Sequence, residues 1–190
     1  MMKRLSILLC AVAVLAGCGS GNKNASPPPP TILPPAESEQ EWAQRIVDGF
    51  LRPLNKDLTV VNGLRDTTSI IYLGNQNKTT LKVVGNALDD LEQCQNKLLS
   101  IGPPPPQSGP FERVNAKFKA ACTSYVPTAR KLKQAVLYWS SGRTDVMPKG
   151  FAVYRSAAKV ANTAGANYLA GVRIAQKLPE FRRAGLQPSA

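Results

Sequence analysis

Proline runs at residues 27–30 and 103–106 limit where this chain can form regular structure. Proline lacks a backbone N–H, and its ring clashes with the preceding helical turn, so neither run can lie inside a helix or a central strand. Most of the 16 prolines in the 190 residues fall in or close to these runs. The stretches between and after the runs are therefore free to form regular structure.

From residue 38 onward, apolar residues recur at steps of three and four, which is the spacing of one helix face. The segment Ser38-Glu39-Gln40-Glu41 has the form of a capping box and marks a helix start. Pro53 and Pro127 are expected to kink or bend the helices that contain them. The pattern predicts helices over residues 38–73, 76–100, 108–139 and 145–178. Short connections between four helices predict an all-α, up-down four-helix bundle.

The first 18 residues have the layout of a secretory signal peptide. Lys3 and Arg4 precede the uncharged apolar run 5–15, which is too short to span a bilayer as a helix of about 20 residues. The run closes on Leu15-Ala16-Gly17-Cys18, which resembles the lipobox of bacterial lipoproteins. The resemblance implies export, cleavage before Cys18 and a diacylglyceryl group on its thiol. The alternative is an ordinary signal peptide whose small residues happen to precede a cysteine.

This organisation divides the chain into a signal peptide (1–17), a lipidated and Pro-rich flexible tether (18–36), a helical domain (37–180) and a disordered tail (181–190). We expect the lipid on Cys18 to hold the protein to the cell membrane. In a host with two membranes, the non-acidic Gly19 resembles the sorting default for the outer membrane. The Pro-rich tether is interpreted as a spacer, with a PxxP recognition site as the alternative.

Four cysteines occur in the chain, at positions 10, 18, 94 and 122. Cys10 leaves with the signal peptide and Cys18 carries lipid, which leaves Cys94 and Cys122 in a compartment that permits disulfides. They lie on the second and third predicted helices, on either side of a Pro-rich turn. We therefore predict a disulfide between them, with two buried free thiols as the alternative.

No catalytic or metal-binding constellation is evident. The chain contains no histidine, which excludes Ser-His and Cys-His catalysis and most zinc sites. Ser156-Ala157-Ala158-Lys159 matches Ser-x-x-Lys, but the other elements of the penicillin-binding families are missing. The acidic residues Asp89, Asp90 and Glu92 are interpreted as a solvated helix face. We therefore expect no enzyme activity, no cofactor and no metal.

The charge distribution is strongly asymmetric. Formal net charge is +12, and from Arg113 to the end the chain has fourteen Lys or Arg but only Asp145 and Glu180 as acids. Six basic residues are predicted to form an anion-binding face, four on the last helix and two beyond it: Arg155, Lys159, Arg173, Lys177, Arg182 and Arg183. Candidate partners are anionic lipid, envelope polymers or an acidic protein, whereas nucleic acid is disfavoured by location. The alternative is a surface that is merely soluble and cationic.

Residues 91–175 contain a pattern made of Leu99 with Pro103-Pro104, Phe111, Phe118, Ala121-Cys122, Tyr125 and Gly142. This pattern resembles uncharacterised helical domains of bacterial surface lipoproteins, and the resemblance implies a fold but no known activity. The function expected is that of a non-enzymatic interaction or scaffolding module at the cell surface. The alternative is a carrier that holds a small apolar or anionic ligand between helices, in space left by the small residues of the last helix.

Overall fold

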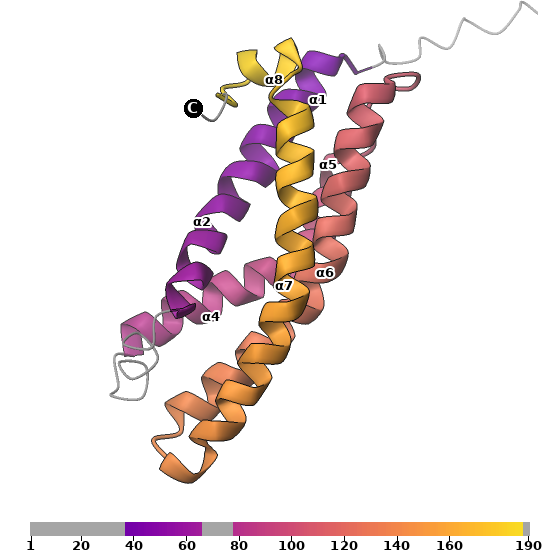
Figure 1. Ribbon diagram of the computed structural model, residues 1–190. Coiled ribbons are helices and arrows are strands. Elements are labelled where there is room, and N and C mark those ends of the chain that lie inside the picture. Colours follow the sequence, from indigo (N-terminus) through magenta and orange to yellow (C-terminus); the bar gives the residue numbers. More distant parts are fainter. Residues whose placement is uncertain (1–36, 66–77, 188–190) are drawn as a thin grey trace, which may run out of the picture. The chain divides into compact units, whose positions relative to one another are not determined.

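The structure is a computed structural model that describes residues 37–65 and 78–187. Every regular element within these residues is a helix, and none of them forms a strand (Figure 1). The predicted all-α class is therefore confirmed for the described part of the chain. The predicted signal peptide, Cys18 and the predicted tether lie outside the described residues, as does the predicted end of the first helix beyond residue 65.

The first helical segment begins at the predicted capping box. Helix α1 (Glu39–Ile46) starts after Ser38, whose side chain accepts from the Glu41 backbone N–H while the Glu41 carboxylate accepts from the Ser38 backbone. The interruption predicted at Pro53 takes the form of a π-helical turn, η1 (Val47–Leu51). Helix α2 (Arg52–Asn62) follows, with Pro53 in its first turn, where the missing N–H needs no partner, and the short η2 (Gly63–Arg65) ends the segment.

The second segment consists of two helices where the sequence predicts one. Helix α4 (Lys78–Glu92) is separated by Gln93 from α5 (Cys94–Ile101), which runs in a different direction (Figure 1). Gln93 has φ −85° and ψ 5°, which lies outside the helical range. Neither proline nor glycine stands at the break, so no residue in the local sequence indicates it. The Pro103–Pro106 run follows α5 and ends the segment as predicted.

Helices α6 (Gly109–Ser140) and α7 (Met147–Ala175) form a long antiparallel hairpin and lie side by side along their length (Figure 1). The turn contains Gly142 at φ 69°, a conformation that favours glycine, and the short η3 (Thr144–Val146). Small residues of α7 let the helices approach closely. A Cβ added at Gly171 would lie only 2.6 Å from Phe118 Cε1, so the aromatic ring fills the space that the glycine leaves.

The core contains two clusters of buried side chains. The larger joins α1, η1, α5, α6 and the end of α7, and its centre is aromatic. Trp42 packs edge-on against Phe111 and Phe181, with ring centroids 5.9 and 6.0 Å away. The smaller cluster joins η2 and α4 to the turn end of the hairpin around Trp139. Both clusters contact α6, which therefore positions the other helices.

The carboxyl-terminal segment differs from the prediction. A disordered tail is expected from residue 181, but Phe181 is 0% exposed and belongs to the core. It lies in helix α8 (Pro179–Arg183), which packs against α1. The physical reason is the aromatic contact with Trp42 and Phe111, which buries a large apolar side chain. The folded domain thus extends past residue 180.

Candidate anion-binding face

Three of the six predicted basic residues, Arg155, Lys159 and Arg173, lie on the exposed side of α7, and the exposed Lys177 follows two residues after its end. Arg155 and Arg173 are five helical turns apart and share one side, and Lys159 and Lys177 follow each of them by about one turn. The α7 seam toward α6 lies on the opposite side of the helix, where Ala164 and Tyr168 are buried as predicted. Two further seam residues, Ala161 and Val172, are only partly buried. The segment from Met147 to Ala175 has no acidic residue, so nothing on α7 neutralises these cations.

Five of the six basic residues of α6 divide into two sets, which the sequence does not separate; the sixth, Lys119, is exposed and belongs to neither set. Arg130 Nε donates to Glu92 Oε1 at 2.7 Å, and Lys133 Nζ donates to Glu92 Oε2 and contacts Asp89 at 2.5 Å. These hydrogen bonds hold the pKa of Glu92 below its ordinary value. Burial disfavours the charged form of Lys133, but the hydrogen bonds that its ammonium group donates to the Asp89 and Glu92 carboxylates outweigh this effect and raise the pKa of Lys133. This set of cations joins α6 to α4 and is already neutralised.

The second set lies on the edge of α6 that faces α7. The Lys117 Cβ is 3.2 Å from where a Cβ on Gly171 would stand, so this lysine sits beside the α7 backbone. Lys131 Nζ donates to Ser156 Oγ at 2.8 Å, and Arg113 precedes Lys117 by one helical turn. None of these three α6 cations forms an ion pair with a described carboxylate.

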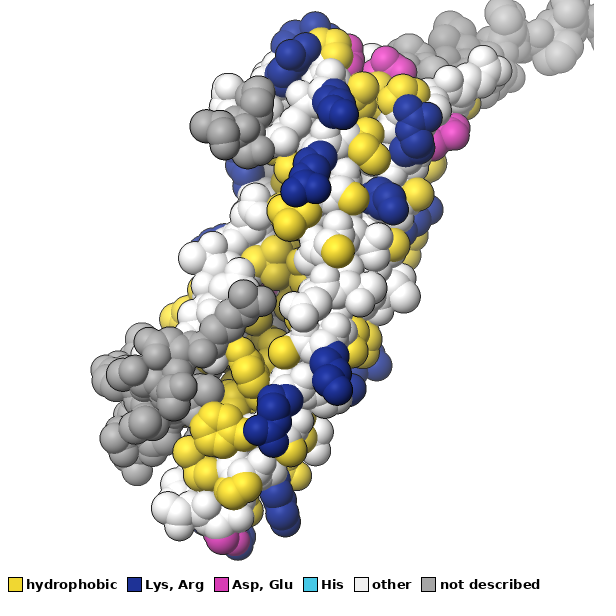
Figure 2. Space-filling model, in the orientation of Figure 1, with side chains coloured by type: hydrophobic (Ala, Val, Ile, Leu, Met, Phe, Trp, Pro, Cys, Tyr) yellow, Lys and Arg dark blue, Asp and Glu magenta, His cyan; other side chains and the backbone are white. Residues whose placement is uncertain are grey.

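Together, the α6 and α7 cations form two clusters on the outer face of the hairpin. We call Arg113, Lys117, Arg173 and Lys177 the near cluster, because they lie at the α8 end, and Lys131, Arg155 and Lys159 the far cluster. Figure 2 shows Lys and Arg side chains gathered in two groups along this side of the molecule, with a stretch of uncharged surface between them. The 18 residues from Arg155 to Arg173 correspond to about 27 Å of helix.

The two arginines beyond α7 have different roles. Arg182 is exposed and pairs with no carboxylate in the described part of the chain. Arg183 instead donates from Nε to Gln40 Oε1 at 2.8 Å and pairs with Glu180 at 3.1 Å. It therefore links α8 to α1, and its charge is partly satisfied within the fold.

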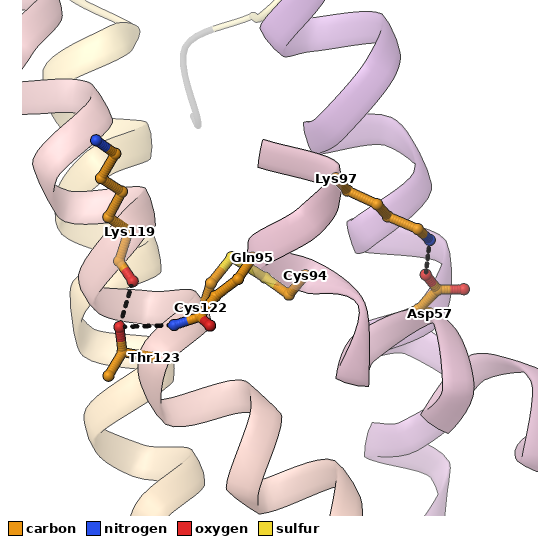
Figure 3. Close-up of a disulfide and its surroundings, with 7 residues drawn as sticks. All are labelled: Asp57, Cys94, Gln95, Lys97, Lys119, Cys122 and Thr123. Atoms are coloured by element: carbon orange, nitrogen blue, oxygen red, sulfur yellow. Dashed lines mark hydrogen bonds and ion pairs between the residues drawn. A yellow bond between two sulfur atoms is a disulfide. The ribbon is translucent and has the colours of Figure 1, made fainter. Parts of the chain in front are cut away.

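The structure pairs Cys94 with Cys122, as the cysteine positions predict (Figure 3). Their Cα atoms are 5.3 Å apart, and the bond joins the first residue of α5 to the middle of α6. Gln95 Nε2 donates to Thr123 Oγ1 at 3.2 Å beside it. The disulfide fixes α5 against the hairpin on the side opposite to the near and far clusters.

The residues considered for catalysis are exposed or held by partners outside their motif. Ser156 and Lys159 are both exposed, and the Ser156 hydroxyl accepts its hydrogen bond from Lys131. Asp89 and Glu92 are held in ion pairs, and no group of acidic or cysteine residues suited to a metal occurs within residues 37–65 and 78–187. Glu37, Glu41, Gln44 and Arg45, at the start of the described residues, border an open pocket of about 590 Å³.

None of the described helices is long and apolar enough to cross a bilayer. No protein family, curated protein or solved structure matches this chain.

Proposed function

We propose that the protein is an exported, lipid-anchored and non-enzymatic interaction module, which binds an anionic partner at the envelope through the outer face of the α6–α7 hairpin. The observation that supports it is the presence of seven basic residues on that face without an acidic partner among the described residues. Clustered cations that the fold does not neutralise produce a positive potential that attracts anions.

The proposed location follows from the lipobox. Lipid on Cys18 would hold the domain at the cell membrane or the outer membrane, with the hairpin facing the periplasm or the exterior. Two or three acyl chains give stable attachment, whereas one chain holds a protein only weakly. As the finer description of the fold, we propose that the four long helical segments form one up-down bundle.

The competing proposal is a carrier for a small ligand between helices. Its support is the row of small residues along α7, which could leave a cavity. Phe118 and Trp139 occupy the space beside Gly171 and Gly150, so the small residues serve close helix packing at these two positions. We therefore favour the interaction module.

Anion binding can be tested without the lipid, in a chain that begins at residue 18 and carries Cys18→Ala. We expect this chain to sediment with phosphatidylglycerol vesicles at low salt and to be released at about 1 M salt, where the screening length is about 3 Å. Replacing Lys159 and Lys177 by Gln should weaken binding. The matched control replaces Lys56 and Lys82, which are exposed and lie outside the hairpin. Equal losses in both variants would contradict the proposed face.

The anchor is tested separately. Cys18→Ala in the full-length chain should move the protein from the membrane fraction to the soluble fraction, or leave it as an unprocessed precursor. If the variant remains in membranes to the same extent as the wild type and is fully processed, the lipid anchor is not what holds the protein there.

A further inference from the structure

The start of the described chain lies beside the near cluster. Gln40, in the first turn of α1, donates from Nε2 to the Glu180 carbonyl at 3.4 Å and accepts from Arg183. Glu180 follows Lys177 of the near cluster by only three residues. The chain that leads to the proposed anchor at Cys18 therefore joins the domain at the near end of the hairpin.

The surface between the two clusters is uncharged (Figure 2). On both helices, positions at steps of four and three run from one cluster to the other along the same face. Between the basic residues, these positions hold side chains that are uncharged and shorter than Lys or Arg: Ala120, Ser124 and Pro127 on α6, and Asn162, Thr163, Ala166, Leu169 and Ala170 on α7. Because Lys and Arg side chains reach further than these residues, a flat surface can meet both clusters at once.

The proposed tether is long enough to permit several orientations of the domain. The 19 residues of the predicted tether (18–36) can span at most about 65 Å. Helix α7, with 29 residues, is about 44 Å long. The anchor alone therefore leaves the domain free to stand upright or to lie along the bilayer, and the orientation depends on the far cluster.

Building on the proposed function, we propose that the hairpin lies flat on the anionic bilayer that carries the lipid anchor, with the far cluster as a second docking point about 27 Å from the near one. The near cluster is already held close to the headgroups by the tether, which raises its effective concentration there. The tether does not raise the effective concentration of the far cluster at the headgroups. The attraction of its three cations to the bilayer therefore sets the ratio of flat to upright domains. Removing three such charges should change the flat-to-upright ratio on the order of 100-fold.

The test uses the lipidated mature chain with a fluorophore attached through Ser141→Cys, at the exposed turn of the hairpin. In this chain the proposed lipid occupies the Cys18 thiol, and Cys94 and Cys122 are bonded to each other, so the introduced cysteine carries the free thiol. Energy transfer to headgroup-labelled lipid then reports how close the turn lies to the bilayer. We expect strong transfer on phosphatidylglycerol-containing vesicles at low salt, and weak transfer on pure phosphatidylcholine or at about 1 M salt.

Two variants with equal charge loss provide the control. With Lys131, Arg155 and Lys159 changed to Gln, transfer on anionic vesicles should fall to the level seen on phosphatidylcholine. With Lys117, Arg173 and Lys177 changed to Gln, the tether still holds the near end, and most of the transfer should remain. Equal transfer by the two variants would overturn the proposal.

A final comparison separates this proposal from the proposed function. If the wild-type turn shows the same transfer on anionic and neutral vesicles while the chain with Cys18→Ala binds soluble polyphosphate, flat docking is overturned and anion binding stands. If polyphosphate and anionic vesicles both fail to bind that chain, the proposed function fails as well.

Discussion

Replacing Gly171 by Ala tests how closely α6 and α7 pack. The added Cβ would lie 2.6 and 2.8 Å from two carbons of the Phe118 ring, where 3.4–4 Å is an ordinary contact. The ring cannot swing away, because it is 0% exposed and packs against Phe50 and Tyr168 at centroid distances of 5.3 and 6.0 Å. Overpacking of this kind costs about 1–3 kcal/mol, against a gain of about 1 kcal/mol in helix propensity.

The matched control is Gly165→Ala in the same helix, where a Cβ would meet nothing within 4 Å. Gly165→Ala should gain only the stabilisation from the higher helix propensity of alanine. The free energy of unfolding of Gly171→Ala should therefore be about 1–3 kcal/mol lower than that of Gly165→Ala. Urea denaturation followed by circular dichroism measures the difference, and each kcal/mol corresponds to roughly 2–4 °C in Tm for a domain of this size. Adding Phe118→Leu should relieve the clash in Gly171→Ala. Equal stability of the two alanine variants would refute the packing described here.

Three further predictions concern the ties between helices. Replacing Cys94 and Cys122 by Ser should lower the free energy of unfolding by roughly 3–4 kcal/mol, because the bond closes a loop between residues 28 apart; an unchanged urea midpoint would count against it. The pKa of Glu92 is lowered by hydrogen bonds from Lys133 and Arg130, so their stabilisation should be present above pH 4.5 and lost as pH falls, and Glu92→Gln should remove that dependence in acid titrations of unfolding. Burial raises the pKa of Asp57 above its ordinary value of 3.8, so the folded state binds the proton more tightly than the unfolded state. The free energy of unfolding should therefore fall as the pH rises from 3.8 through the raised pKa, and Asp57→Asn should remove this fall in acid titrations of unfolding.

The sequence predicts helices well where local signals are strong. The capping box at Ser38, the Pro-rich run after α5 and Gly142 each mark a boundary that the structure has. The break at Gln93 is not predicted because the local sequence favours a helix there. Cys94, the next residue, is buried and bonded to Cys122 of α6, a contact that the local sequence pattern does not contain. Helix α8 could have been predicted from the sequence, because Phe181 is a large apolar residue two positions after Pro179, and proline suits a first helical turn.

The cations of the candidate site could be predicted only in part. Spacing alone places Arg155 and Lys159 on one side of α7. Whether a basic residue of α6 is free or neutralised depends on which helix lies beside it, and that is set by packing. Arg130 and Lys131 are neighbours in the sequence, yet one pairs with Glu92 of α4 and the other reaches Ser156 of α7.

The proposed lipid anchor underlies the proposed location and orientation of the domain. The most direct test is mass spectrometry of the amino-terminal peptide of the protein purified from bacterial membranes. We predict that the peptide begins at Cys18 and carries a diacylglyceryl group on its thiol. A mature chain that begins elsewhere, or an unmodified Cys18 thiol, would contradict the account.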